Sequence, residues 1–280
     1  MDLEKYRKSE TSQWGEDGVI AEIFKRIGTK SKIAVEFGSW DGKYLSNIWD
    51  LWHNKDWHAV LIESDKKRSD EAQREYKAFD KVKFVTAFVE AAGENSLENI
   101  LTREIGSQVP DLISIDIDSD DYYIFESLKE HLPRVVVIEF NPSIPPHVEA
   151  VQSPGQYFGA SALSQLKLGK KKGYSLAFVT KTNLILVNNK DFAKLKIKEV
   201  ELTLDNFPHY LLTYIISSYD GSPIMIGTPP FVSPKAMDEV ADMKRYQAKT
   251  PKIASHSIET MQPVTIFAKA KSKKPRSAKK

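Results

Sequence analysis

The chain contains the stretch Ile33-Ala-Val-Glu36-Phe-Gly38-Ser-Trp40-Asp41-Gly42, around which the rest of the sequence can be interpreted. Its apolar residues predict a buried strand over 33–37, which contains the carboxylate of Glu36 and is followed by two glycines four residues apart. A segment compatible with a helix, 44–52, comes next. This order of strand, acid, glycine turn and helix is how doubly wound α/β folds open a nucleotide-sized crevice.

The rest of the chain repeats this pattern of strand and helix. Further strands are predicted at 58–62, 82–86, 112–115 and 134–138, and two β-rich runs at 174–180 and 183–187 predict a closing hairpin. Helices are predicted at 19–27, 66–79, 97–105, 122–132 and 161–172. Five strand–helix units followed by an antiparallel hairpin predict one open, mostly parallel, seven-stranded α/β sheet with helices on both faces.

Several side chains that can accept a proton lie at or just beyond the predicted strand ends: Asp116, Asp118, Glu139 and His147. Glu139 follows a very apolar strand, so desolvation is expected to raise its pKa towards a value useful for general base catalysis. Two alternatives stay open. Glu139 could be a structural carboxylate that bonds loop amides, and His147 could be a surface histidine following two prolines.

The aspartates after the fourth strand begin with the spacing of a calcium-binding loop. Its sixth position is Asp121 instead of glycine and its twelfth is Ser127 instead of glutamate, so that motif is rejected. A magnesium ion held by the aspartates with Glu139 and Asn141 is an alternative that we do not favour, since helix capping and cofactor contacts also explain these acids. No metal site is predicted.

On these residues the chain resembles the class I S-adenosylmethionine-dependent methyltransferases, and among them the FkbM-type branch, over about residues 12–189. The acid-x-Gly-x-x-x-Gly signature that ends their first strand is matched by Glu36, Gly38 and Gly42. In that family the acid that ends the second strand binds the ribose hydroxyls, and Glu63 matches it. A carboxylate suits this role because it can accept from both hydroxyls. The resemblance implies a set of cofactor contacts: Glu36, Gly38, Ser39, Trp40, Gly42, Glu63, Ser64, Ala87, Phe88 and Asp116.

The chain also departs from the family patterns. The FkbM-type Lys-Ile-Asp-Val-Glu-Gly-x-Glu pattern is matched by residues 114–121, where Ser114 and Ser119 replace the lysine and the glycine. Trp40 replaces the middle glycine of the wider superfamily signature. Some relatives keep the fold without demonstrable catalysis, so a binding or scaffold protein is the main alternative to an active methyltransferase.

The resemblance implies methyl transfer to oxygen, with a sugar or another small molecule as the acceptor, although a macromolecular acceptor stays open. Asn141 begins a proline-marked loop, 141–159, at the crevice mouth, where substrate contacts are expected. Gln13 and Asp17 precede the first helix and are predicted to contact substrate as part of a polar lid. The alternative is that this segment only caps the helix.

Composition is that of a soluble globular protein, with 41% hydrophobic and 28% charged residues among 280. The absence of cysteine excludes disulfides, and neither a signal peptide nor a membrane span is predicted, so a cytoplasmic location is expected. We expect three regions: a methyltransferase-like domain at 1–190, an extension at 191–249 packed on it, and a disordered tail at 250–280.

The charge is concentrated at the end of the chain. Residues Lys269–Lys280 include six lysines and Arg276 without an acid, a charge of +7, so the remaining body carries −5 against a net +2. A solvated tail is the plain interpretation, and a tether to nucleic acid or anionic lipid is the alternative. The tether would suit a nucleic-acid-modifying methyltransferase. An NAD-dependent enzyme is disfavoured by the terminal hairpin and by the lack of a Gly-x-Gly-x-x-Gly run. The oligomeric state is not predicted.

Overall fold

A computed structural model describes residues 2–157, 159–207, 213–217, 219 and 223–227. Contacts divide the described residues into two units, of which the larger contains the residues up to Thr213 together with Gly227. The smaller is built on a two-stranded sheet of β8 (Thr213–Ser217) and β9 (Pro223–Gly227). The basic tail lies outside the described residues.

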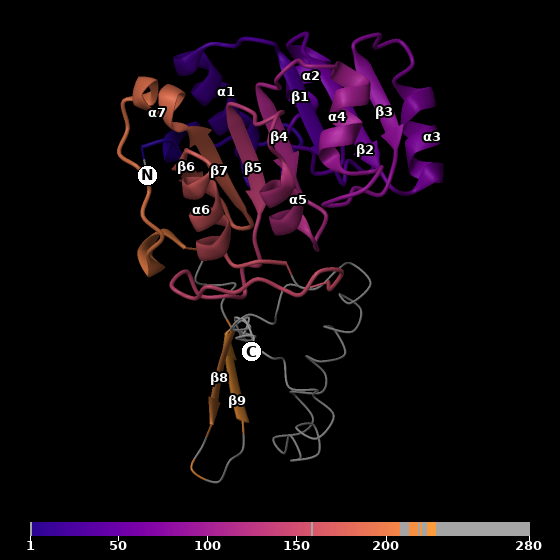
Figure 1. Ribbon diagram of the computed structural model, residues 1–280. Coiled ribbons are helices and arrows are strands. Elements are labelled where there is room, and N and C mark those ends of the chain that lie inside the picture. Colours follow the sequence, from indigo (N-terminus) through magenta and orange to yellow (C-terminus); the bar gives the residue numbers. More distant parts are fainter. Residues whose placement is uncertain (1, 158, 208–212, 218, 220–222, 228–280) are drawn as a thin grey trace, which may run out of the picture. The chain divides into compact units, whose positions relative to one another are not determined.

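The larger unit is built on a seven-stranded sheet in the order β3-β2-β1-β4-β5-β7-β6 (Figure 1). Neighbouring strands are parallel from β3 to β5, whereas β7 is antiparallel to both β5 and β6. The strands are β1 (Ile33–Phe37), β2 (His58–Glu63), β3 (Val82–Thr86), β4 (Leu112–Ile115), β5 (Val135–Glu139), β6 (Tyr174–Val179) and β7 (Asn183–Asn188). This is the predicted α/β Rossmann-like sheet with its antiparallel closing hairpin, which is thereby confirmed.

Helices cover both faces of the sheet (Figure 1). They are α1 (Glu16–Ile27), α2 (Trp49–Asn54), α3 (Lys66–Glu75), α4 (Leu97–Ile105), α5 (Asp121–Ser127), α6 (Ala162–Lys171) and α7 (Asn189–Leu195), with short 3₁₀ turns at Glu4–Tyr6 and Leu204–Asn206. Alternate strand residues enter different cores: Val35 packs with α4, α5 and α6, whereas Ala34 packs with α1, α2, α3 and α7. Among the described residues, no helix is both long and apolar enough to cross a bilayer.

Two predicted helices are shorter than expected. The helix predicted at 44–52 begins only at Trp49, because Leu45 has a φ of 56° that a right-handed helix cannot contain. The helix predicted at 122–132 ends at Ser127, since Leu128 is extended and the next two amides donate to the Glu98 carboxylate instead of continuing the helix. Long-range contacts thus override the helical pattern at both places.

The amino ends of β4 and β5 are joined by a buried ion-pair network. Arg134, which is 5% exposed, donates to Asp111 Oδ1 at 2.9 Å and to Asp191 Oδ2 at 2.7 Å. It also donates to the carbonyls of Gly28 and Ile27. The guanidinium therefore ties together the end of α1, the start of β4 and β5, and α7.

Candidate functional site

The loop after β1 has an unusual backbone. Gly38 and Gly42 have φ values of 73° and 81°, and Trp40 between them has a φ of 51°. A Cβ on Gly38 would lie 1.9 Å from the carbonyl oxygen of Asp116, so only glycine allows the end of β4 to approach this turn. The glycine at 38 therefore has a structural requirement of its own, whatever ligand the loop binds.

Glu36 fixes residues 46 and 47, further along this loop, to the sheet. Its buried carboxylate accepts from the Ser46 hydroxyl and from the Asn47 N–H, while the Asn47 side chain donates to Ser114 Oγ at 3.1 Å. Burial raises the pKa of Glu36 to about 7, even though the bonds from Ser46 and Asn47 favour the ionised form. Glu36 is therefore enclosed by the loop that the sequence predicted to bind cofactor.

Glu63 ends β2 and is 7% exposed. Its Oε2 accepts from the Trp40 N–H at 2.9 Å, and its Oε1 accepts from the Asp65 N–H at 2.8 Å and from the exposed Ser64 hydroxyl at 3.4 Å. Oε2 has a further lone pair that can accept from a hydroxyl group of a ligand. Backbone amides thus hold the predicted ribose-binding carboxylate in a fixed orientation.

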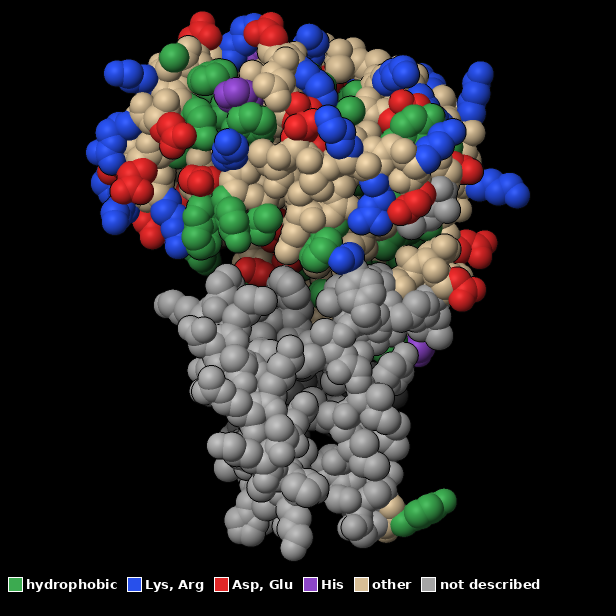
Figure 2. All heavy atoms as spheres, turned by 180° about the vertical axis from the view of Figure 1, so that it is seen from behind, with side chains coloured by type: hydrophobic (Ala, Val, Ile, Leu, Met, Phe, Trp, Pro, Cys, Tyr) green, Lys and Arg blue, Asp and Glu red, His purple; other side chains and the backbone are tan. Residues whose placement is uncertain are grey.

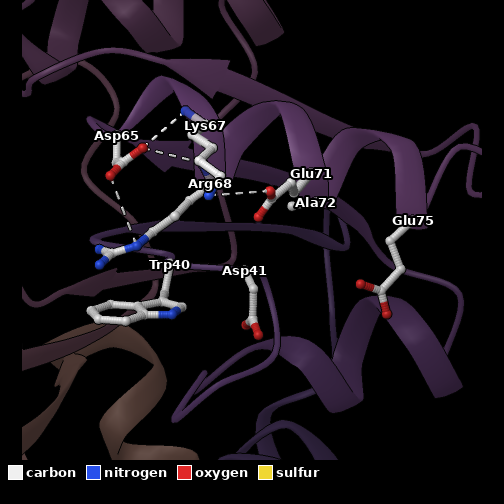
Figure 3. A pocket seen from close by; sticks show the side chains of 8 residues that line it. All are labelled: Trp40, Asp41, Asp65, Lys67, Arg68, Glu71, Ala72 and Glu75. Carbon is white, nitrogen blue, oxygen red and sulfur yellow. Dashed lines mark hydrogen bonds and ion pairs between the residues drawn. The ribbon is translucent and has the colours of Figure 1, made fainter.

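Trp40 lines a surface pocket of about 470 Å³ on the α3 side of this loop (Figure 3). The lining residues are Trp40, Asp41, Asp65, Lys67, Arg68, Glu71, Ala72 and Glu75. The indole is 39% exposed, and the guanidinium carbon of Arg68 lies 3.4 Å from its ring centroid. A left-handed conformation at a bulky residue costs about 1–2 kcal/mol. A cation–π contact offsets roughly 0.5–2 kcal/mol of this cost.

Three carboxylates meet at the ends of β4 and β5. Asp116, Asp118 and Glu139 each offer an oxygen, and these atoms lie within 4.8 Å of one another. Burial, followed by the negative charge of neighbouring carboxylates, holds the pKa of Asp116 and that of Glu139 well above their ordinary values. Such a set can accept a proton or, with its hard oxygen atoms, ligate a divalent cation. The structure thus brings three of the four predicted proton acceptors together.

The neighbouring aspartates fold the loops around this cluster. Asp121 accepts from the N–H groups of Ile117 and Ser119, and burial raises its pKa to about 6. Asp120 is the N-cap of α5, but its side chain does not cap the helix and accepts from the Gln152 side chain and the Gly155 N–H instead. These contacts anchor the loop after β5 to the start of α5.

Tyr157, on the same loop, was missed by the sequence analysis. Tyr157 is 62% exposed as a residue, and its hydroxyl donates to Asp118 Oδ2 at 2.7 Å. Asn141 begins the loop half-buried, with its Oδ1 accepting from the Ser143 N–H. His147 is exposed and is not part of the cluster of Asp116, Asp118 and Glu139. No local signal in the sequence distinguishes Tyr157, because its partner lies 39 residues away.

The segment before α1 folds around Asp17. Asp17 Oδ2 accepts from the N–H groups of Glu10, Thr11 and Ser12, whereas Oδ1 is buried without a hydrogen-bond partner among the described residues. The N-cap of α1 is Gly15, with a φ of 91°, and Ser12 Oγ accepts from the Asp17 N–H. The Ser12 side chain thus caps an amide in the first turn of α1, and Asp17 in turn holds the preceding segment against the helix.

Polar residues follow one face of the sheet at its carboxyl edge. Glu36, Ser114, Glu139 and Asn183 take the alternate strand positions that otherwise pack with α1, α2 and α3. The predicted cofactor contacts after β3, the half-buried Ala87 and the exposed Phe88, lie at the same edge. Five carboxylates of this edge form no ion pair with a basic side chain of the described part of the chain: Glu36, Glu63, Asp116, Asp118 and Glu139. The edge therefore suits a cationic ligand.

No protein-family model matches the chain, and no curated protein matches it. Solved structures that are similar in part include a SAM-dependent methyltransferase from Aquifex aeolicus, at 13% identity and a TM-score of 0.37, covering 66% of this chain and 95% of that one. The CMeT domain of the citrinin polyketide synthase has 11% identity and a TM-score of 0.41, covering 62% of this chain and about half, 51%, of that one. The N-terminal domain of EvdMO1 with SAH bound also has 11% identity and a TM-score of 0.41, covering 67% and 92%.

Likenesses this distant concern the fold and assign neither substrate nor activity. The strand order and the antiparallel hairpin establish the α/β Rossmann-like fold from the structure itself. Function must be argued from the carboxyl edge of the sheet.

Proposed function

We propose that this protein is an S-adenosylmethionine-dependent methyltransferase of the FkbM-like type that transfers a methyl group to an oxygen atom of a sugar or another small molecule. The observation that carries the proposal is Glu63, held by two backbone amides at the end of β2 beside the glycine turn of residues 38–42. A carboxylate in this place can accept from the ribose hydroxyls. The unpaired carboxylates of the same edge suit the positive charge of a sulfonium.

The residues present fit this cofactor in one further respect. Asp17 Oδ1 is a buried acceptor without a partner among the described residues, and an ammonium group is a donor that could satisfy it. When bound, S-adenosylmethionine supplies a methyl group to a nucleophile held in line with its sulfonium. The chain then has to orient the acceptor, exclude water and take one proton.

Glu139 and Asp116 are the candidates to take that proton. Their raised pKa values make each carboxylate a stronger base than an exposed one once it is ionised. Asn141 and Tyr157, which lie on the loop after β5, would contact the acceptor. The substrate contacts of Gln13 and Asp17 and the proton-accepting role of His147 stay predictions.

The test is calorimetric titration of the full-length protein with S-adenosylmethionine and S-adenosylhomocysteine. Glu63→Ala should weaken binding by about tenfold or more, which corresponds to about 1.4 kcal/mol. Asp70→Asn is the matched control, because Asp70 is a carboxylate on the adjacent helix that pairs with Lys66. Folded wild-type protein that binds neither ligand would contradict the proposal.

A binding protein without turnover is the second candidate, and Ser114 favours it. The position of the FkbM-type lysine holds a fully buried hydroxyl that is engaged by Asn47. This candidate predicts that the protein binds S-adenosylmethionine, while incubation with labelled cofactor and pooled hydroxylated small molecules yields no labelled product.

The nucleic-acid alternative depends on residues Lys269–Lys280, which lie outside the described residues. On the face drawn in Figure 2, the described Lys and Arg side chains are interspersed with Asp and Glu. Salt-sensitive binding of a random RNA that is lost on deleting 269–280 would support this alternative.

A further inference from the structure

Trp40 has a backbone conformation that its own side chain disfavours. Its φ of 51° lies in the left-handed region, which a bulky residue adopts only when its surroundings impose it. The flanking Gly38 and Gly42 also have positive φ, but they do so at no steric cost. Contacts from outside the loop must therefore hold Trp40 in place.

Two such contacts are present, one on the backbone and one on the side chain. The Trp40 N–H donates to Glu63 Oε2, and the Arg68 guanidinium carbon lies 3.4 Å from the centroid of the indole. Figure 3 shows the guanidinium over the flat face of the ring and beside Asp65, whose Oδ2 is 4.0 Å from Arg68 Nε. Arg68 is thus braced by the N-cap of its own helix while it covers the indole.

We propose that Arg68 is a positioning residue for the cofactor site. Its guanidinium holds the Trp40 indole, the indole keeps the loop in its left-handed turn, and the turn presents the Trp40 N–H to Glu63. The role of Arg68 in cofactor binding rests on the proposed function, whereas its hold on the loop does not.

A looser loop is expected to bind the cofactor less tightly. Without the stack, the backbone at Trp40 can relax to a negative φ and withdraw its N–H from Glu63 Oε2. Ordering the loop again would then oppose binding, because conformational freedom lost on association weakens affinity. Methyl transfer from the bound cofactor should change little, since Arg68 acts through the loop and not on the reacting atoms.

The first experiment uses the ligand-free, full-length protein. Hydrogen exchange of the Trp40 amide, followed by NMR, should be about tenfold faster in Arg68→Gln, because exchange reports local opening. Arg68→Lys, which keeps the charge, should restore part of the protection. Lys67→Gln is the matched control: it removes the same charge from the next position and the same pocket. Unchanged exchange in Arg68→Gln, or an equal change in Lys67→Gln, would overturn the proposal.

The second experiment is calorimetric titration with S-adenosylmethionine. Arg68→Gln and Trp40→Gly should each raise Kd by roughly fivefold, about 1 kcal/mol. Trp40→Gly is informative because it removes the backbone strain: if the stack had no role in binding, glycine would bind as well as tryptophan or better. Wild-type protein that binds no cofactor would defeat the proposed function, and the exchange rates would still decide whether Arg68 holds the loop.

Discussion

Charged residues lie at both ends of strands β4 and β5, and their partners differ between the two ends. At the amino ends, Asp111 and Arg134 are buried together and bonded to each other, with Asp191 as a third partner. At the carboxyl ends, Asp116 and Glu139 lie among like charges and pair with no described cation. The amino end is satisfied internally, whereas the carboxyl end is left to be satisfied by protons or a ligand.

This difference is expected if the amino ends of the strands stabilise the fold and the carboxyl ends bind a ligand. A buried charge without a partner is costly, so it persists in native proteins mainly where a site requires it. The same two strands therefore provide an internal control: changes at one end should affect stability, and changes at the other should affect ligands and pH dependence.

The largest effect is expected at the amino end. Arg134→Met should lower the free energy of unfolding by about 3–5 kcal/mol, because it leaves Asp111 and Asp191 buried without their partner. Urea unfolding measures this directly. Lys194→Met is the control: Lys194 also pairs with Asp191 but is half exposed, so its loss should cost less than about 1 kcal/mol. Equal losses in the two variants would remove the distinction between a satisfied network and a surface pair.

The next effect is a pH dependence of opposite sign at the two ends. Arg134 lowers the pKa of Asp191, so the stability that this pair contributes is present above the unfolded pKa and is lost as the pH falls below about 4. Burial raises the pKa of Glu36, at the carboxyl edge, from 4.5 to about 7. The folded protein therefore binds more protons than the unfolded chain between these values, and stability falls as the pH rises through them, by about 2–3 kcal/mol.

Urea unfolding between pH 3 and pH 8 checks both limbs of this profile. Glu36→Gln should make the limb between pH 4.5 and pH 7 shallower, since glutamine keeps the acceptor for the Asn47 N–H without the charge. The limb should not vanish, because further carboxylates with raised pKa values have the same sign of effect: Asp116, Asp121 and Glu139. Glu71→Gln, at an exposed carboxylate, should leave the limb unchanged. A wild-type protein whose stability rises steadily from pH 4.5 to pH 7 would show that Glu36 is ionised at no cost.

The sequence predicts strands better than helix ends, and the reason is physical. Short, mostly apolar runs such as 112–115 become buried strands with the predicted bounds, because both of their faces are covered. Helices end where distant groups capture their amides. Leu128 leaves the helical conformation beside amides that bond Glu98, 31 and 32 residues away, and no local pattern encodes this.

In the candidate site too, some contacts follow from the order of the strands and others depend on tertiary packing. The sequence places Asp116 and Glu139 at strand ends, and they meet because parallel strands end at one edge of a sheet. The pairing of Arg134 with Asp191, 57 residues away, depends on tertiary packing that no spacing rule contains. The stack of Arg68 on Trp40 is of the same kind, since it joins the loop after β1 to helix α3.

The smallest effect, and the one that separates the two ends most sharply, is a gain in stability from removing a charge. Glu139→Gln takes one negative charge from a group of carboxylates whose oxygens lie within 4.8 Å of one another. At pH 8, where the wild-type cluster is driven towards ionisation, the variant should be more stable by about 1 kcal/mol after solvent screening of the repulsion.

At pH 5 the gain should vanish, because the raised pKa values of Asp116 and Glu139 mean that the cluster already holds protons there. Urea unfolding at the two pH values measures both outcomes, and Glu75→Gln, outside the cluster, should change neither by more than about 0.5 kcal/mol. A loss of stability at pH 8 would mean that the Glu139 carboxylate has a stabilising partner in the folded protein. Arg134 immediately precedes strand β5 and Glu139 ends it, so opposite signs for their two variants would show that the charge at one end maintains the fold and the charge at the other end is retained for a ligand.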